Sequence, residues 1–489
     1  MSKPNFLLDL KQLFSDSFIY GISGILSKFI GIFLLPIYIR IFSPEEYGIL
    51  DILSLTGAIL LIFVICGLDN ALFRFFYDTE DEEERKQIVS SITFLALLIS
   101  FIVCILLIIF SKQISLFLVN NENYYLLVIC VSFLLPSNVL KSFTSSLLRL
   151  NFRPIEYTIS NVSGLILTIV SSIYLIVILK IGLIGVFLGI ILGNSLQIIF
   201  NFLYVKHNFT LKLKFSLGSI KEYLNYGIPL LPASIATWGL VYVNRYILFY
   251  FSGLSAVGIY SVGYRISSIL VLITGAFTMA WSPFAFSILN KPDAKETYAR
   301  IFKYLLKILF DIAAFITIFS KEILTIIATE DYMDANNLIG ILMLSFIGTA
   351  AYYVLCIGAT IEKKTFDISK ALFLGSAINI MIGIVFVPLF GALGAAIAMA
   401  IGYLFTCIYM YKFSQKHYFI PYDISRIIYL LIIYLIIYII SIIFDDFLNP
   451  VKIIVLFCYY VILFYVIFND YDKNLIKTCV KSIYYKLKK

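Results

Sequence analysis

The chain has 489 residues, of which 61% are hydrophobic and only 13% are charged, and its mean hydropathy is +0.98. These values are typical of a polytopic membrane protein and leave no room for a soluble catalytic domain. The formal net charge of +8 indicates contact with an anionic membrane surface, so nucleic acid is not needed as a partner to explain it.

Apolar runs of about 20 residues, which is long enough to cross a bilayer, follow one another along almost the whole chain. They predict an all-α polytopic membrane protein with about 14 transmembrane helices. In chain order the predicted spans are 15–39, 47–68, 88–110, 124–148, 157–179, 184–205, 224–251, 257–286, 303–327, 336–361, 366–388, 391–411, 424–444 and 451–468.

The distribution of lysine and arginine predicts that both chain termini face the cytoplasm. With an inside amino terminus, the cytoplasmic loops and the span ends beside them hold 28 of the 37 cations, whereas the outer side holds five and the spans hold four. Such an excess on the cytoplasmic side is the positive-inside rule. We therefore expect a multi-pass protein of the cytoplasmic membrane with an even number of helices.

The first predicted span carries a lysine near its middle. Lys28 lies about 13 residues into the span 15–39, which is roughly 20 Å along a helix. A cation near the bilayer centre costs at least about 2.5 to 3.5 kcal/mol on insertion scales, so it normally faces a polar cavity or an ionic partner. Lys28 is therefore a candidate for lining a cavity inside the membrane.

Three further cations fall inside later spans, and with Lys28 they are candidates for lining one cationic cavity between two halves of the protein. They are Lys141 in span 124–148, Arg245 in span 224–251 and Arg265 in span 257–286. The alternative is that each cation reaches a lipid headgroup or pairs with a carboxylate. The carboxylates considered for such pairs are Asp51, Asp69 and Asp311.

Parts of the chain recur at a nearly constant spacing. Gly182 and Gly193 recur 209 residues later as Gly391 and Gly402, and the tripeptide Tyr-Gly-Ile at 20–22 recurs 206 residues later at 226–228. Transporters are often built from such internal repeats. The repetition predicts a six-helix N-lobe over 1–205, a six-helix C-lobe over 206–412, and a carboxyl-terminal helix pair with a basic cytoplasmic tail over 413–489.

The opening of the chain resembles a known family. A basic residue followed by "IGIFLLPIYIRIFSPEEYGILDIL" at 30–53, together with the turns "GLIG" at 182–185 and "GALG" at 391–394, is similar to the Wzx-type oligosaccharide flippases. These polysaccharide exporters belong to the multidrug/oligosaccharidyl-lipid/polysaccharide exporter superfamily, with the multidrug extrusion proteins and the lipid II flippases. The resemblance extends along essentially the whole chain.

The resemblance implies a flippase rather than an enzyme. The expected substrate is a polyprenyl-diphosphate-linked oligosaccharide, which would cross the membrane by alternating access for cell-surface polysaccharide biosynthesis, for example of the O-antigen of lipopolysaccharide. The implied partners are this lipid-linked oligosaccharide, membrane lipids, and polysaccharide polymerases and glycosyltransferases. Neither a cofactor nor a metal is expected.

The resemblance also suggests roles for the charges inside the membrane. The cations would meet the pyrophosphate or acidic sugars, so the candidate substrate-binding residues are Lys28, Arg265, Arg245 and Lys141. The sequence has no ATP-binding motif, so energy would come from ion gradients, the membrane potential or consumption of the product. The candidate ion-coupling residues are Asp51, Asp69 and Asp311.

Two alternative functions remain open. An ion-coupled multidrug or cation antiporter of the same superfamily would favour an acidic rather than a basic cavity. A membrane-embedded polysaccharide polymerase or acyltransferase would place charged or histidine-bearing loops at the outer face. The predicted outer loops are short and carry few cations, and both histidines, His207 and His417, fall in predicted cytoplasmic loops.

Overall fold

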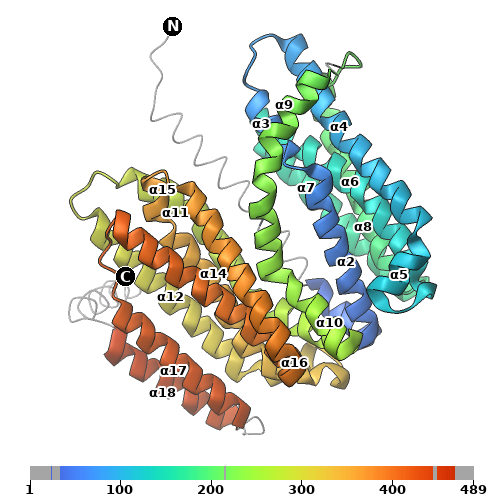
Figure 1. Ribbon diagram of the computed structural model, residues 1–489. Helices are drawn as coiled ribbons and strands as arrows, with labels where there is room; N and C mark the ends of the chain where they lie inside the picture. Colours follow the sequence, from blue (N-terminus) through green and yellow to red (C-terminus); the bar gives the residue numbers. More distant parts are fainter. Residues whose placement is uncertain (1–23, 25–32, 214–215, 444–448, 468–489) are drawn as a thin grey trace, which may run out of the picture.

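The computed structural model describes residue 24 and residues 33–213, 216–443 and 449–467. Within these ranges the protein is built from helices and short connections and contains no β-strand (Figure 1). The predicted all-α membrane fold is confirmed. Ten helices of the described residues are long and apolar enough to cross a membrane. Lys28 and the basic tail lie outside the described residues.

The helices of the first half pack together into what we call the first bundle (Figure 1). A helix over residues 33–41 precedes it. Ser43 then caps the next helix in a capping box with Glu46, and Pro44 occupies its first turn, which together define where this helix begins. The first bundle consists of α2 (Pro44–Ile65), α3 (Leu68–Phe75), α4 (Glu82–Ile109), α5 (Ser111–Val119), η1 (Glu122–Tyr124), α6 (Tyr125–Leu150), α7 (Pro154–Ile173), η2 (Tyr174–Ile178), α8 (Leu183–Val205) and η3 (Lys206–Asn208).

The helices of the second half begin with α9 (Leu217–Gly227), η4 (Ile228–Leu230) and the long α10 (Leu231–Ser267), which lies along α2. We call the helices that follow α10 the second bundle. It consists of α11 (Leu270–Ser287), α12 (Ala294–Ile318), α13 (Ser320–Ile327), η5 (Glu330–Ala335), α14 (Asn336–Leu355), α15 (Ile357–Ile361), α16 (Thr365–His417), α17 (Ile424–Ile443) and α18 (Asn449–Ile467).

Two of the long helices contain a glycine with a non-helical backbone, α10 at Gly253 and α16 at Gly391. Gly391 interrupts the 53-residue α16 with φ 54° and ψ −130°, a conformation that is accessible to glycine. A straight helix of this length would extend about 80 Å, whereas the hydrocarbon core is about 30 Å thick. Gly375 packs against Gly402, so the two halves of α16 run antiparallel and account for the predicted spans 366–388 and 391–411. Within the described residues, each other predicted span from 47–68 onward overlaps one or more helices, although spans 224–251 and 257–286 divide α10 between them.

The backbones of α2 and α10 approach each other very closely. A Cβ atom placed on Gly258 would lie 1.9 Å from the carbonyl oxygen of Pro44, and one on Gly48 would lie 2.1 Å from that of Leu254. Side chains at these positions would hold the helices apart. The α10 helix also packs extensively on α16, so it connects the first bundle to the second.

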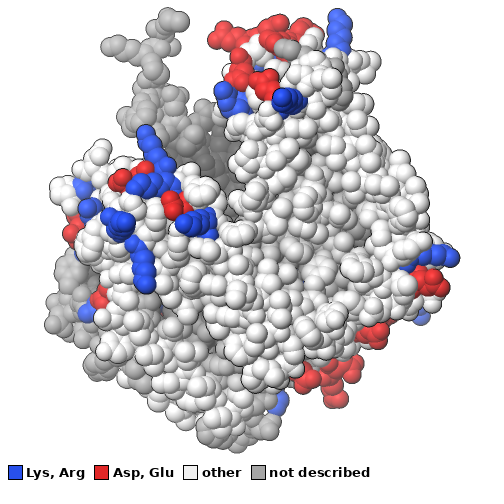
Figure 2. All heavy atoms as spheres, viewed as in Figure 1, with Lys and Arg blue, Asp and Glu red and all other residues white. Residues whose placement is uncertain are grey.

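The outer surface of the molecule is largely uncharged between the helix ends. Figure 2 shows Lys, Arg, Asp and Glu gathered near the ends of the helices, with a broad uncharged surface between them. Phe101, Ile105 and Ile109 follow one another at four-residue spacing on α4, and all three are exposed. An exposed apolar face of this size indicates contact with lipid.

Candidate functional site between the bundles

A buried ion pair joins α2 to α10 in the interior. Arg245 Nε lies 2.7 Å from Asp51 Oδ2, and the hydroxyl of Ser261 donates to the same oxygen at 2.6 Å. Arg245 is 2% exposed and Asp51 is 9% exposed. Such a pair is held by hydrogen bonds as well as by charge, because desolvation otherwise offsets much of the attraction. Asp51 therefore compensates a cation that sequence analysis selected for substrate binding.

Three tyrosines surround the guanidinium group of Arg245. Its central carbon lies 5.5 Å from the ring centre of Tyr242, 5.2 Å from that of Tyr260 and 4.2 Å from that of Tyr264. Cation–π contacts of this kind are strongest where water is excluded. They hold the arginine in place beside Asp51.

Arg265 lies one helical turn after Ser261 on α10 and belongs to the same cluster. Its guanidinium group interacts electrostatically with the Tyr47 hydroxyl and with Asp51. In contrast to Arg245, Arg265 has an exposed side chain. The cluster thus combines one buried arginine, one accessible arginine and one carboxylate at the junction of the bundles. We call Asp51, Arg245 and Arg265 the junction cluster.

Lys141 lies away from the junction cluster, in a cavity of about 520 Å³ that we call the first-bundle cavity. Its described lining comes from α2, α6, α7 and α8. Lys141 Nζ donates to Asn194 Oδ1 at 2.8 Å, and Asn194 Nδ2 donates to Asn138 Oδ1 at 3.0 Å. The sequence analysis grouped Lys141 with Arg245 and Arg265 in one cavity. The described lining of the first-bundle cavity includes neither arginine.

The candidate ion-coupling carboxylates are also found in different places. Asp51 belongs to the junction cluster, whereas Asp69 lies in the first turn of α3, where it accepts from Asn70 at 3.2 Å. Asp311 pairs with Lys307 of the same helix, α12, at 2.6 Å. The structure therefore gathers Asp51 with Arg245 and Arg265, and gives Asp69 and Asp311 other partners.

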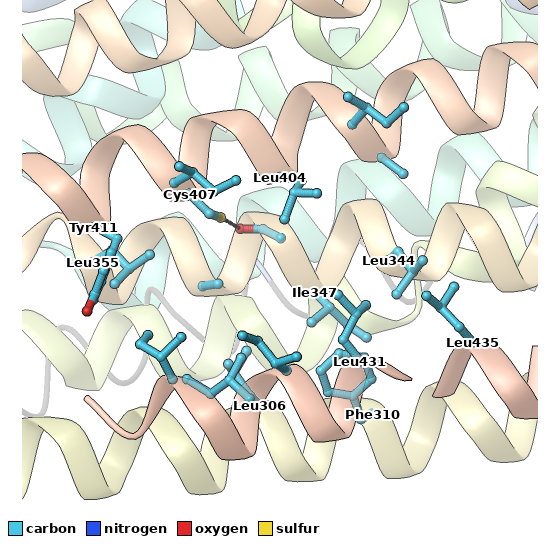
Figure 3. Close-up of a pocket in the computed structure, with 18 of the residues that line it drawn as sticks. Leu306, Phe310, Leu344, Ile347, Leu355, Leu404, Cys407, Tyr411, Leu431 and Leu435 are labelled. Atoms are coloured by element: carbon cyan, nitrogen blue, oxygen red, sulfur yellow. Dashed lines mark hydrogen bonds between the residues drawn. The ribbon is translucent and has the colours of Figure 1, made fainter. Parts of the chain in front are cut away.

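The second bundle holds an apolar cavity of about 500 Å³ (Figure 3). Leu306 and Phe310 of α12, Leu344 of α14, Leu404 of α16 and Leu431 of α17 contribute to its lining. The hydrogen bond drawn in Figure 3 joins the thiol of Cys407 to the Gly348 carbonyl, so these polar atoms satisfy each other. What remains is a surface suited to a hydrocarbon chain.

Residues 37–337 match the family model of the polysaccharide biosynthesis proteins. The chain belongs to this family. An uncharacterized membrane protein of Methanocaldococcus jannaschii, MJ1068, is 25% identical over 404 residues, which is 76% of each chain. The match confirms the resemblance to polysaccharide exporters on which the sequence analysis relied.

The fold of the chain is similar to that of several solved membrane transporters. The lipid II flippase MurJ in an inward closed conformation superposes with a TM-score of 0.73 at 18% identity, covering 94% of this chain and all of that one. An inward-facing multidrug resistance MATE transporter of the MOP superfamily gives 0.63 at 18% identity, covering 82% of this chain and 94% of its own. The fold of this family member is therefore that of the MOP transporters.

The sequence analysis did not predict several residues that contact the junction cluster. Ser261 and the three tyrosines around Arg245 are common residues in membrane helices, so none is conspicuous alone. A usable signal was their spacing: Tyr260 and Tyr264, like Ser261 and Arg265, are four residues apart and so share a helical face. The amides Asn138 and Asn194 beside Lys141 carried no comparable signal.

Proposed function

We propose that the protein carries a polyprenyl-diphosphate-linked oligosaccharide from the cytoplasmic to the outer leaflet of the cytoplasmic membrane and leaves it chemically unchanged. The main support is the junction cluster, in which the exposed Arg265 lies beside the buried pair of Asp51 and Arg245. Membership in the polysaccharide biosynthesis family supports the same substrate class.

Arg265 is the residue that would first bind the diphosphate. A guanidinium group offers paired donors that match phosphate oxygens, and a diphosphate beside it competes with Asp51 for the cations. This competition would weaken the contact between α2 and α10. Binding of substrate would then favour separation of the helices, which alternating access requires.

The polyprenyl chain would not need to cross the junction. The apolar cavity among α12, α14, α16 and α17 has the chemistry to hold part of such a chain while the polar head passes between the bundles. This division places the diphosphate and the glycan on the bundle interface and leaves the tail with lipid or with the second bundle.

The proposal includes an orientation and a division of the chain. Both termini would face the cytoplasm, in keeping with the positive-inside rule. The N-lobe 1–205 and the C-lobe 206–412 would move relative to each other, and 413–489 would follow the C-lobe. Glycosyltransferases would supply the substrate and a polysaccharide polymerase would consume it, as in the assembly of O-antigen.

The test uses purified protein in liposomes that contain a fluorescent lipid-linked oligosaccharide and follows its exposure to an external, membrane-impermeant glycosidase. We expect the protein to expose glycan from the inner leaflet. Arg265→Ala should abolish this activity and Arg265→Lys should retain part of it. The control is Lys112→Ala, which changes a cation beside Tyr125 near one end of the first bundle.

Two results would contradict the proposal. Exposure equal to that of empty liposomes, under a range of imposed ion gradients and potentials, would exclude flipping of this substrate. Efflux of cationic dyes from the same vesicles would instead support the ion-coupled antiporter.

A further inference from the structure

A smaller polar cavity lies at one end of the first bundle, and the proposed passage between the bundles does not explain it. Its volume is about 290 Å³. The segment after α3, the start of α4, the end of α6 and the short helix η3 enclose it. We call it the end cavity, and its described lining includes Phe76, Glu82, Arg85, Asn151, His207 and Asn208.

Arg85 brings a positive charge to the end cavity, and neutral groups hold its guanidinium group in place. The central carbon of the group lies 5.0 Å from the ring centre of Phe76, and Nη2 donates to the carbonyl oxygen of Thr79 at 2.7 Å. The buried Nε has no hydrogen-bond acceptor among the described residues. Arg85 is therefore oriented by a ring and a carbonyl, and an anionic ligand would add the ion pair that these contacts do not supply.

Glu82 brings a negative charge to the same cavity. It lies three residues before Arg85 on α4, so the two side chains share a helical face, and both line the end cavity. The neighbouring ion pair on α4 joins Lys86 to Glu83 at 2.7 Å and leaves Glu82 and Arg85 out. A simple anion would be repelled by Glu82 and a simple cation by Arg85, so the cavity favours a ligand that carries both charges.

The end cavity adjoins the lipid-facing surface of α8. Ile199 and Leu203 lie four residues apart on this helix and are 59% and 58% exposed, which indicates contact with lipid. His207 follows after four more residues and lines the cavity. The cavity thus lies where the apolar surface ends, at the level of lipid headgroups. Pockets with basic residues between helix ends are known sites for such headgroups.

We propose that the end cavity binds a zwitterionic headgroup in which a short linker joins a phosphodiester to a primary ammonium group, as in phosphatidylethanolamine. Arg85 would donate to the phosphodiester oxygens, and Glu82 would accept from the ammonium group. Asn151 Nδ2 donates to Asn208 Oδ1 at 2.9 Å, and this amide pair would form a neutral polar wall. The acyl chains would extend along the exposed surface of α8. The inference does not depend on the cargo of the protein.

A binding experiment tests the chemistry of the site. Full-length protein in detergent micelles is titrated with short-chain phosphatidylethanolamine, or with the phosphatidylglycerol or phosphatidylcholine of the same chains, and the Tm is measured. Phosphatidylethanolamine should raise the Tm most, because the glycerol headgroup has no ammonium group and the choline headgroup cannot donate a hydrogen bond to Glu82. Equal increases for all three lipids would overturn the proposal.

Soluble glycerophosphoethanolamine distinguishes the two sources of this headgroup. A Tm increase as large as that with the lipid would support a site that takes the headgroup from solution. A much smaller increase would support a lipid ligand whose acyl chains contribute to binding. An increase no larger than that with inorganic phosphate, together with equal effects of the three lipids, would show that the ammonium group is not recognised and would refute the site.

Two variants and a control test the assigned residues. Arg85→Met should weaken phosphatidylethanolamine binding about tenfold or more, because it removes charged hydrogen bonds. Glu82→Gln should reduce the binding of phosphatidylethanolamine to that of phosphatidylglycerol. The matched control is Arg426→Met on α17, which removes an arginine that pairs with Asp423 at 3.1 Å and lies outside the end cavity. It should bind like the native protein.

A third variant keeps the test decisive if Arg85→Met does not fold. Glu82 is exposed, so Glu82→Lys should fold normally, and it should reverse the preference by repelling the ammonium group and attracting the anionic phosphatidylglycerol. A native-like preference for phosphatidylethanolamine in folded Glu82→Lys, or native-like affinity in folded Arg85→Met, would overturn the proposal.

Discussion

Arg245 and Asp51 face each other where water is largely excluded, and their pairing explains how an arginine can lie inside a membrane protein without contacting lipid headgroups. Asp51 supplies the charge, Ser261 shares the carboxylate, and three tyrosines present ring faces to the guanidinium group. Each partner is needed because a single buried charge is far less stable than the pair. The same contacts leave Arg265 as the accessible cation of the junction cluster.

The first prediction concerns this pair. Arg245→Met or Asp51→Asn alone should lower the free energy of unfolding by about 3 to 5 kcal/mol, because each leaves an uncompensated buried partner. The double variant should lose less than the sum of the single losses. Denaturant unfolding of the purified protein measures all three variants. Additive losses would show that the two side chains do not stabilise each other.

A control for the same measurement comes from the exposed pair of Lys86 and Glu83 on α4, whose charged atoms lie 2.7 Å apart. Lys86→Ala should leave the free energy of unfolding essentially unchanged, since water and salt screen a pair at the surface. A loss as large as that of Arg245→Met would indicate a general sensitivity to lost charge.

At the scale of single helices, α2 and α10 can pack closely because glycines occur where their backbones meet. Gly48 and Gly258 each allow a carbonyl oxygen of the other helix to approach to a distance that no Cβ atom would permit. Small residues serve the same purpose in membrane helix pairs generally. The close approach then brings Asp51 within reach of Arg245.

The second prediction follows from that contact. Gly258→Ala should force α10 away from α2 and lower the free energy of unfolding by about 1 to 3 kcal/mol, the usual cost of overpacking. The matched control is Gly218→Ala in α9, where a Cβ atom would meet nothing closer than 3.7 Å and alanine favours the helix. Denaturant unfolding compares the two variants. Equal stability of both would mean that the backbones can separate at little cost.

The sequence predicted helix positions better than it predicted helix partners. Apolar length locates spans such as 88–110 reliably, because crossing a bilayer requires it. The predicted span 391–411 begins at Gly391, and the non-helical backbone of this residue is where α16 breaks into two halves. The pairing of Asp51 with Arg245 joins residues 194 positions apart and depends on how α2 packs on α10. No local pattern records that packing, and so the sequence could not separate Lys141 from the junction cluster.

At the scale of the whole molecule, the two bundles meet along α2 and α10, and the proposed transport requires this contact to open. Locking this contact should stop the cycle.

The third prediction tests that requirement. Thr56 of α2 and Tyr246 of α10 have hydroxyl oxygens 2.8 Å apart. In a background without other cysteines, Thr56→Cys with Tyr246→Cys should be joined by a short thiol cross-linker that a reductant can cleave. Glycan exposure in liposomes should fall at least tenfold after cross-linking and return after reduction. Full activity of the cross-linked protein would refute movement at this junction.

The control pair for the cross-link lies inside the second bundle. Thr317 of α12 and Tyr434 of α17 have hydroxyl oxygens 2.9 Å apart, which matches the distance at the junction. Cross-linking Thr317→Cys to Tyr434→Cys should leave transport unchanged, because both helices belong to the same bundle. Loss of activity here would indicate that the reagent itself damages the protein.

The unequal charges of the junction cluster have an electrical consequence. Asp51 pairs with Arg245 and interacts electrostatically with Arg265. The described cluster therefore has one positive charge in excess, which is too little to neutralise a diphosphate fully. The polar head of the substrate would thus cross as an anion. In a cell with a negative interior, outward movement of a negative charge is favoured by about 2.3 kcal/mol per charge for each 100 mV. The membrane voltage alone would therefore pull the proposed cargo outward.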